Sequence, residues 1–476
     1  MQSNRRHQRE RIVATACVGA VALAASLWIS WWQWQTLSTP SWDLGIFTQL
    51  AAAYAHGSAP IVEIKGPNYN LLGDHFHPIL ILLGPLYRLA PSPLTLLVTQ
   101  DVLFSLSAAA LTWRTWHLTA RWVAVICGVI LAVGWPTQTA VASQFHEIAF
   151  AVPLVTFALT SYLARRYRQA AWWMAGLVFV KEDLGLTVAV FGCILLWRWW
   201  HIRDTPAGPP LRRTALATLM WGIIWFVLTV TVILPAFNPT GGYDYTDRLT
   251  GASVLTFFTP ATKLVLLGLL AVTAGLIGLT SPLIMLVLPT MAWRFAGNVE
   301  FYWWIGWHYD VILLPILLIA LIDATSMHSL TARLLPTKRY ALRRLGVLLA
   351  SASSLLVITD LPLITMTPHE LTASSAIQRR AASDAIHAHI AALTTADGSE
   401  VQVAADATML ARLVDVADVC WAGDSRFTPD VVVLDDYWSG RGAPIDSAAR
   451  AQADYGVEYR EIYHAAGLRV AERVVH

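Results

Sequence analysis

The sequence is poor in charged residues and in cysteine. Asp, Glu, Lys and Arg make up 13% of its 476 residues, whereas an average soluble chain carries about 25%. Its four cysteines have spacings that match neither a disulfide framework nor a zinc site. The net charge of +2 by itself says nothing about nucleic acid, because the placement of the charges is what matters; we expect no nucleic-acid partner. An ordinary soluble domain and a disulfide-rich secreted domain are disfavoured.

Hydrophobic residues are abundant instead, at 56% of the chain, and the mean hydropathy is +0.52. Because a helix needs roughly 20 apolar residues to cross a bilayer, the apolar runs predict about eleven spans. They lie near residues 12–34, 93–112, 122–141, 149–164, 170–181, 184–199, 214–235, 261–279, 281–296, 309–324 and 345–364. The first run is too long for a signal peptide, so we expect an uncleaved span. The shorter run at 76–90 contains Pro78 and Pro85 and predicts a helix that lies at the membrane interface or dips into the membrane without crossing it.

The basic residues give this layout an orientation. Arginine clusters fall on alternate connections, within residues 5–11, 114–121, 165–168, 198–213 and 333–344. The positive-inside rule places such clusters in the cytoplasm. We therefore predict a multi-pass protein of the cell (cytoplasmic) membrane, with a cytoplasmic N-terminus and an extracytoplasmic C-terminal domain.

The C-terminal part differs in character from the rest. Residues 374–393 have the pattern of an amphipathic helix, and 400–406 and 431–436 have that of strands, with weaker strands at 457–463 and 468–474. Alternating helices and strands predict a small α/β domain. The expected fold is mainly α: a polytopic membrane helical bundle at 1–364 and an extracytoplasmic α/β domain at 365–476.

Ionisable residues gather in the segments that this layout places on the outer side. Five clusters stand out: Asp43, Asp74-His75-Phe76-His77, Gln144-Phe145-His146-Glu147, Lys181-Glu182-Asp183 and Trp307-His308-Tyr309-Asp310. Ionisable groups held at a membrane boundary mark a functional site by default. The first two clusters share one outer loop, at 36–92, and a helical bundle would bring the others to the same end.

These residues fit the transfer of a sugar from a lipid phosphate to a hydroxyl group. A carboxylate must take the proton of the acceptor, and Asp43 is the candidate. The same residue also suits the first turn of a helix, where it would interact with the helix dipole. Positive charge must balance the departing phosphate. Candidate cations are Lys181, Arg248 and, when protonated, His75, His146 and His308.

Structural interpretations of the other clusters stand beside the functional ones. His75 and His77 are two residues apart and would lie on different faces of a helix, so they share a metal only in an extended segment. The 181–183 cluster also fits a charge-satisfied hairpin tip. The 308–309 pair also fits interfacial anchors, and the loop at 243–248 fits a lid or a passive connection equally well.

The order of these motifs resembles that of one family. The residues that carry the likeness are Trp42-Asp43-Leu44-Gly45-Ile46-Phe47 with Gln49, Gly73-Asp74-His75-Phe76-His77-Pro78, Phe145-His146-Glu147, Lys181-Glu182-Asp183 and His308-Tyr309. They resemble a family of prokaryotic predicted membrane proteins, catalogued as the domain of unknown function two thousand and seventy-nine. The likeness covers nearly the whole chain. Each motif is short, but five of them in the right order form a fairly specific signal.

That family looks like a branch of the GT-C glycosyltransferases. The resemblance implies a helical bundle, a polyprenyl-phosphate-linked sugar as donor, and a catalytic acid in the first outer loop, where Asp43 lies. The residues expected to line the substrate site are Asp74, His75, His77, His146, Glu147, Lys181, Glu182, Asp183, Arg248, His308 and Tyr309. Some GT-C enzymes hold a divalent metal through an Asp-x-Asp pair. The first loop here has single acids, so a requirement for Mg²⁺ or Mn²⁺ stays open. Membrane lipid is an expected partner, and the acceptor, whether glycan, lipid or protein, is not identified.

Two other classes of function stay open. A transporter or flippase for a lipid-linked or polar solute typically has inverted repeats and charges at mid-membrane. This chain has no convincing internal repeat, and its acids lie at span ends, with Asp101 as the main exception. A non-catalytic cell-envelope assembly protein would depend on its C-terminal domain more than on Asp43. The main hypothesis is a membrane glycosyltransferase acting on the outer face.

Overall fold

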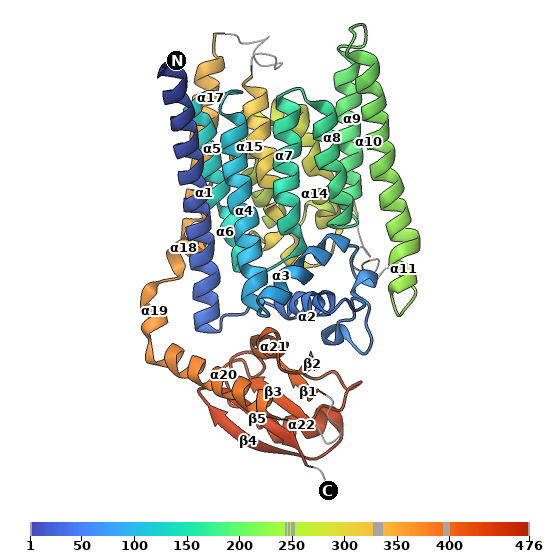
Figure 1. Cartoon of the computed structure of the whole chain (residues 1–476), viewed down its shortest axis with the longest axis vertical. Coiled ribbons are helices and arrows are strands. Elements are labelled where there is room, and N and C mark those ends of the chain that lie inside the picture. Colours follow the sequence, from blue (N-terminus) through green and yellow to red (C-terminus); the bar gives the residue numbers. More distant parts are fainter. Residues whose placement is uncertain are drawn as a thin grey trace.

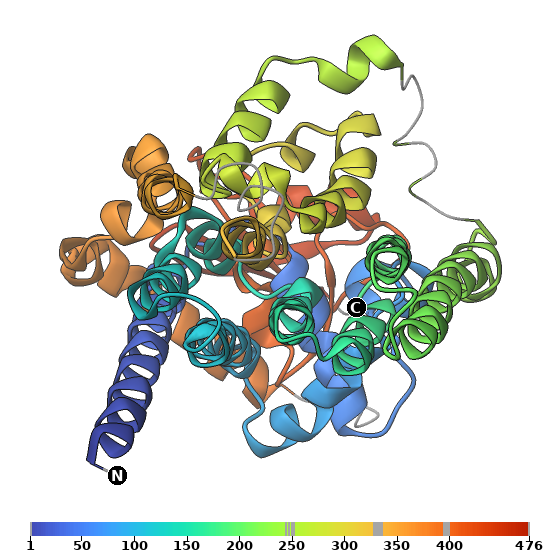
Figure 2. The ribbon, with the colours of Figure 1, turned by 90° about the horizontal axis from the view of Figure 1, so that it is seen from above.

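The protein is a bundle of helices with a small sheet domain beyond one end (Figure 1). The computed structural model describes residues 2–242, 245, 248, 253–326, 337–393 and 400–474. The N-terminus lies at the end of the bundle away from the sheet domain, and in the view along the bundle the first helix leans outward at the rim (Figures 1 and 2). The sheet domain lies beneath the helices in that view.

The described helices of the bundle differ widely in length. They are α1 (Gln2–Thr36), α2 (Asp43–Ala55), α3 (Leu83–Leu89), α4 (Pro93–Thr115), α5 (Arg121–Val133), α6 (Trp135–Ala142), α7 (Ala151–Leu163), α8 (Tyr167–Ala175), α9 (Leu184–Trp200), α10 (Gly208–Leu228), α11 (Leu234–Phe237), α12 (Val254–Phe258), α13 (Thr262–Thr273), α14 (Leu288–Ala296), α15 (Leu313–Ala324), α17 (Arg339–Ala352), α18 (Pro362–Thr365) and α19 (Pro368–Thr372). Among the described residues, five helical segments are long and apolar enough to cross a membrane: Arg5–Thr36, Pro93–Thr115, Arg121–Ala142, Gly208–Phe237 and Arg339–Asp360. The expected helical bundle is confirmed, and the span count stays a prediction.

Several expected spans are interrupted in the structure. The expected span at 122–141 breaks at Gly134, because Pro136 enters the first turn of α6 and cannot continue the hydrogen-bond ladder of α5. The expected span at 170–181 consists of α8 and a 3₁₀ turn at Gly176–Phe179. It therefore ends just before Lys181, which leaves the polar 181–183 segment outside regular structure.

The small C-terminal sheet is confirmed. Its helices are α20 (Ser374–Ala392), α21 (Ala407–Leu413) and α22 (Ser447–Tyr455), and its strands are β1 (Gln402–Ala405), β2 (Asp418–Trp421), β3 (Val431–Asp435), β4 (Tyr459–Ala465) and β5 (Leu468–Arg473). The strand order is β2-β1-β3-β5-β4, with β1 parallel to β2 and β3, and β5 antiparallel to β3 and β4. All five residues of β3 are buried, as its continuous apolar run requires of a central strand. The sequence analysis missed β2, which is only four residues long.

The sheet domain packs on α2, the helix that begins with Asp43. Gln49 Nε2 donates a hydrogen bond to the Val419 carbonyl at 3.1 Å. The rings of Trp42 and Trp421 meet edge to face with their centroids 5.1 Å apart. Such aromatic pairs contribute about 0.5–1.5 kcal/mol beyond the area they bury. The C-terminal domain therefore holds α2 in place although the two are more than 350 residues apart in the chain.

Candidate active site

Asp43 is the first residue of α2, and its carboxylate faces His146. Ser41 Oγ donates to Asp43 Oδ2 at 2.6 Å, and His146 Nε2 lies 3.5 Å from the same oxygen. Burial raises the pKa of Asp43, but the hydrogen bonds from His146 and Ser41 and the charge of His146 outweigh it, so the pKa lies below its ordinary value. About 27% of the side chain is exposed. Asp43 is thus an ionised carboxylate that a substrate hydroxyl can approach.

A second histidine stacks on His146. The ring of His308 lies parallel to that of His146, with the centroids 3.6 Å apart and the planes inclined by 24°. Burial and the nearby positive charges, His146 first among them, hold the pKa of His308 well below its ordinary value. A neutral ring therefore covers the face of the histidine that contacts Asp43. The stack fixes the orientation of His146 beside Asp43.

Lys181 and Glu182 form ion pairs with residues from two different segments. Lys181 Nζ donates to Glu147 Oε1 at 2.9 Å, and Glu182 lies 2.8 Å from His75 Nδ1. Burial lowers the pKa of Lys181, but the charges of Glu147 and Glu182 outweigh it and raise that pKa well above its ordinary value. The carboxylate of Glu182 likewise raises the pKa of His75 against the effect of burial. The 181–183 cluster is therefore not a self-neutralised hairpin tip, because its charges join two distant segments.

Asp74 continues this chain of ion pairs toward the edge of the site. Its Oδ2 lies 3.1 Å from Lys65 Nζ, and Tyr245 Oη donates to its Oδ1 at 3.1 Å. Burial raises the pKa of Asp74, but the charges of His75 and Lys65 lower it by more than burial raises it, so the pKa lies below its ordinary value. The ring of Tyr245 also stacks on His75 at 4.5 Å between centroids. A tyrosine from the loop between α11 and α12 therefore covers this part of the site.

Asp183 borders a small cavity at the centre of the site. Trp293 Nε1 donates to Asp183 Oδ2 at 2.9 Å, while Asp183 Oδ1 is buried without a hydrogen bond. Burial raises the pKa of Asp183 to about 6, with Glu182 adding to the shift and Lys181 opposing it. The cavity has a volume of about 20 Å³. Its lining includes Glu147, Lys181, Asp183, Trp293, His308 and Tyr309.

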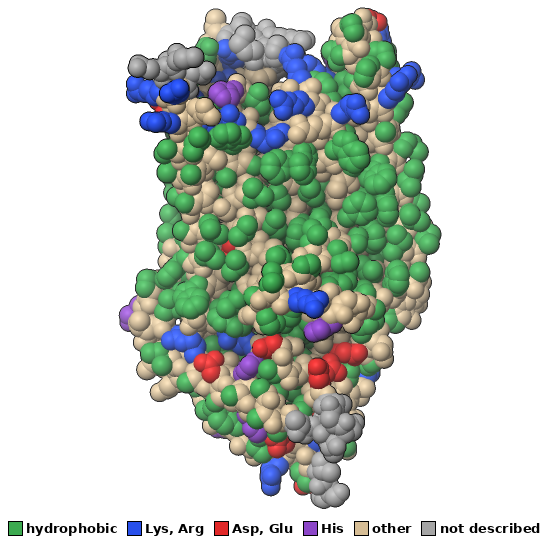
Figure 3. Space-filling view, viewed as in Figure 1, with side chains coloured by type: hydrophobic (Ala, Val, Ile, Leu, Met, Phe, Trp, Pro, Cys, Tyr) green, Lys and Arg blue, Asp and Glu red, His purple; other side chains and the backbone are tan. Residues whose placement is uncertain are grey.

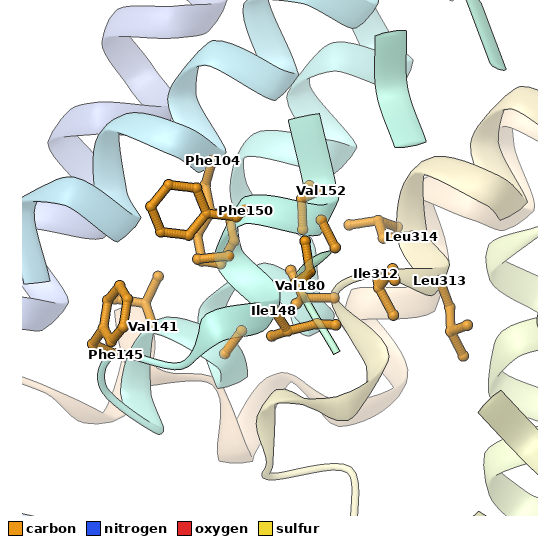
Figure 4. Close-up of a cluster of buried hydrophobic side chains, with 14 of the residues drawn as sticks. Phe104, Val141, Phe145, Ile148, Phe150, Val152, Val180, Ile312, Leu313 and Leu314 are labelled. Carbon is orange, nitrogen blue, oxygen red and sulfur yellow. The ribbon is translucent and has the colours of Figure 1, made fainter. Parts of the chain in front are cut away.

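A cluster of buried hydrophobic side chains lies next to the ionisable groups. Phe145, Ile148 and Phe150 flank the His146–Glu147 pair in sequence, Val180 precedes Lys181, and Ile312 follows the 308–310 turn. All five side chains are buried and lie in one cluster (Figure 4). Such packing excludes water beneath the charges and strengthens the interactions among them.

Two expected site residues, His77 and Arg248, lie apart from the central charges, whereas Tyr309 borders the central cavity. His77 is buried, its Nδ1 has no hydrogen bond, and burial lowers its pKa to about 4. It thus faces different surroundings from His75, although residues 75–77 are not helical and the argument from helical spacing does not apply to them. Arg248 donates to the Tyr302 hydroxyl at 2.9 Å and covers the Tyr245 ring, so its described contact with the site is through that tyrosine. Tyr309 packs on the His308 ring at 4.1 Å between centroids.

No group of three or more His, Cys, Asp or Glu side chains within the described part of the chain is placed to hold a metal ion. Four contacts of the site escaped the sequence analysis: Ser41, Lys65, Tyr245 and Trp293. Lys65 had a usable signal, since it is a lone lysine within the same polar loop as Asp43 and Asp74.

The fold and the site define a helical membrane protein whose ionisable groups gather at one end of the bundle, beside a small α/β domain. The chain belongs to the family described as predicted membrane protein (DUF2079), which matches residues 33–435. The family expected from the order of the motifs is thus confirmed. Among curated proteins, no relative matches the chain.

Solved structures share the fold over nearly the whole length. ArnT from Cupriavidus metallidurans bound to undecaprenyl phosphate has a TM-score of 0.56 and 12% sequence identity, and the match covers 98% of each chain. The apo state of the same ArnT gives a TM-score of 0.54 and 14% identity, over 97% of this chain and 98% of that one. At this identity the likeness establishes a common fold and no more.

Proposed function

We propose that the protein is a GT-C-type membrane glycosyltransferase. It moves a sugar from a polyprenyl-phosphate donor to an acceptor hydroxyl at the outer face of the cytoplasmic membrane. The observation that carries this proposal is the Asp43–His146 contact of 3.5 Å at a partly exposed position within a cluster of buried ion pairs. The ArnT-like fold supports the choice of lipid, because one of the similar structures holds undecaprenyl phosphate.

Asp43 acts as the general base. Its carboxylate takes the proton of the acceptor hydroxyl while the acceptor oxygen forms a bond to the anomeric carbon of the sugar. The bond between that carbon and the phosphate oxygen breaks, and the polyprenyl phosphate leaves with the electron pair. Ser41 and His146 position the carboxylate through its Oδ2, which leaves Oδ1 to face the acceptor.

Lys181, Lys65 and His75 provide the positive charge for the departing phosphate. Each now contacts a carboxylate at 2.8–3.1 Å. A phosphate that enters the cluster offers these cations a second anion at comparable distance, and charge-assisted contacts of this kind stabilise developing negative charge. A divalent metal, Mg²⁺ or Mn²⁺, is part of the proposal only as a condition to be tested in the assay.

A transfer assay with a matched pair of variants tests the proposal. Purified protein in lipid is incubated with a panel of radiolabelled polyprenyl-phosphate sugars, with and without divalent metal, and with water or added acceptors. Asp43→Asn should reduce release of the sugar by about 10³-fold or more, which is the order expected when a general base and its hydrogen-bond geometry are lost. Asp415→Asn is the control, because Asp415 also pairs with a histidine, His387, at 3.1 Å, but in the C-terminal domain.

Full activity of Asp43→Asn would show that Asp43 is not the general base. Equal loss in Asp43→Asn and Asp415→Asn would point to a general effect on the protein. If the wild type binds the donors but releases no sugar, the acceptor is missing from the panel. Absence of binding favours the transporter or assembly-protein hypothesis, and labelled lipid flip in vesicles then becomes the deciding measurement.

A further inference from the structure

A second and larger cavity lies at the end of the bundle away from the sheet domain. Its volume is about 530 Å³, and it lies between the turn that joins α7 to α8 and the start of α10. Its lining includes Arg165, Arg166, Arg168 and Tyr167. Because α7 has 13 residues and a helix rises about 1.5 Å per residue, α7 separates this cavity from Glu147 by roughly 20 Å. The cavity is therefore distinct from the candidate active site.

The positive charge in this cavity is not neutralised from within the described part of the chain. The ion pairs described at this end join Glu10 to Arg6, His7 and Arg121, and Arg203 to Asp204. None of these pairs involves an arginine that lines the cavity. Three guanidinium groups on neighbouring residues, with no carboxylate among them, concentrate positive charge at the cavity and so favour an anion there.

Two helices point their N-terminal ends into the same cavity. The first turns of α8 and α10 both contribute to its lining. In α8 the N–H groups of the first turn have no partner within the helix. In α10, Pro209 and Pro210 have no N–H, and the N–H groups of Gly208 and Leu211 donate to Thr205 and Ala207. The positive end of the dipole of each helix still lies at the cavity, and it favours an anion. The residues before the two helices, Arg166 and Ala207, form no side-chain caps. Guanidinium groups and helix dipoles thus converge on one space.

We propose that this cavity binds the phosphate group of an anionic membrane lipid. Arginine suits this role because its planar fork matches phosphate oxygens in two parallel hydrogen bonds. The lipid source follows from the surroundings: Lys and Arg side chains gather at this end, at the border of the apolar belt (Figure 3). Exposed tryptophans, Trp172 at 78% and Trp200 at 59%, stand on α8 and α9 at the same end, where tryptophan marks a membrane interface.

Lipid retention measured by native mass spectrometry of the full-length protein tests this site. The test variant is Arg165→Gln/Arg166→Gln/Arg168→Gln. The matched control is Arg203→Gln/Arg212→Gln/Arg213→Gln, which removes the same charge from the same end without touching the residues that line the cavity. Each protein is titrated with phosphatidylglycerol, phosphatidylcholine and inorganic phosphate. The test variant should bind phosphatidylglycerol about 100-fold more weakly than the wild type, since each arginine near an anionic lipid contributes on the order of a fivefold change.

The outcomes separate the alternatives. Loss in the test variant but not in the control, with partial recovery in Arg165→Lys/Arg166→Lys/Arg168→Lys, supports the site, because lysine keeps the charge without the fork. Equal loss in test and control variants, or no loss in either, overturns it. Displacement of phosphatidylglycerol by an equal concentration of inorganic phosphate would overturn the lipid assignment and leave a site for a soluble phosphate. The lysine variant also shows whether the glutamine variant has merely misfolded.

Discussion

The two ends of the bundle treat charge in opposite ways. At the end beside the sheet domain, Lys181, His75 and Lys65 each contact a carboxylate at 2.8–3.1 Å, and the cavity among these groups is only about 20 Å³. At the other end, three arginines border an empty space of about 530 Å³. Space-filling representation shows Asp and Glu side chains toward the first end and a band of Lys and Arg at the second (Figure 3).

This contrast indicates how the charges at each end are stabilised in the absence of a ligand. Charges that are buried and paired lose the stabilisation that water gives them, and only accurate contacts with one another replace it. The free protein therefore holds them in one geometry. Exposed arginines keep their water and need no internal partner. The first end is therefore preorganised for chemistry, and the second is available to an anion from outside. Changing single charges at the two ends tests this distinction.

The largest effect is expected where one partner of a buried pair is removed. Lys181→Met leaves Glu147 as an uncompensated buried carboxylate, and Glu147→Gln leaves a buried ammonium group. Each single variant should lower the free energy of unfolding by about 3–5 kcal/mol. The double variant should regain most of this loss, because no unpaired charge remains. Thermal unfolding of the four proteins in detergent, arranged as a double-mutant cycle, measures the coupling.

The same cycle separates stability from activity. The double variant should fold well yet transfer sugar poorly, because the cation that faces the departing phosphate is gone. The pair Arg294–Asp310, fully buried at 2.6 Å, offers a control in which the same kind of cycle should show coupling without a specific loss of transfer. A Lys181–Glu147 coupling near zero would contradict the account of this end as a set of mutually dependent charges.

Sequence reasoning could find the residues of this end but not their pairing. The helical bundle follows from apolar runs, and the five polar motifs follow from their place between those runs. The partners could not be assigned, because Lys181 could pair with any carboxylate of the outer segments and Glu182 with any of their cations. Only the packed structure shows that Lys181 turns to Glu147 and Glu182 to His75.

Other features were hidden for different physical reasons. The strand β2 is no shorter than β1, but it lacks the polar-apolar alternation that Glu400-Val401-Gln402-Val403 gives β1. The contact between α2 and the sheet domain joins segments too distant in sequence for any local pattern to reveal. The helix break at Gly134 could have been predicted from the sequence, since Pro136 follows it. The arginines at 165–168 were visible as a topology signal, whereas the cavity they border depends on how α8 and α10 pack.

An intermediate effect is expected at Asp183, the carboxylate of the site whose burial is not fully offset. Its pKa is raised from about 3.8 to about 6, so the folded protein holds this proton more tightly than the unfolded chain does. The contribution of Asp183 to stability is then most favourable below pH 4 and is lost as the pH rises from about 4 to about 6. Asp183→Asn should remove this fall and stabilise the protein at pH 7.5 by up to about 3 kcal/mol.

The difference in unfolding temperature between Asp183→Asn and the wild type, followed from pH 4.5 to 7.5, measures this contribution. It should grow with pH up to about 6 and then level off, because above that pH the carboxylate is ionised in both states. A difference that is constant with pH would show that Asp183 acts through packing or through its bond from Trp293. In that case the charges of this end are more completely balanced than the geometry indicates.

The smallest effect is expected from the same chemical change at the opposite end. Glu10→Gln removes a carboxylate that contacts Arg6 at 3.2 Å and Arg121 at 3.0 Å, so by distance alone it resembles Glu147→Gln. All three side chains are well exposed, however, at 39–82%, and exposed ion pairs are screened by water and salt. The unfolding temperature should stay within experimental error of the wild type at low and at high salt. A loss comparable to that of Glu147→Gln would mean that pairing, and not burial, distinguishes the two ends, and the exposed arginines around the large cavity would then need an internal partner as well.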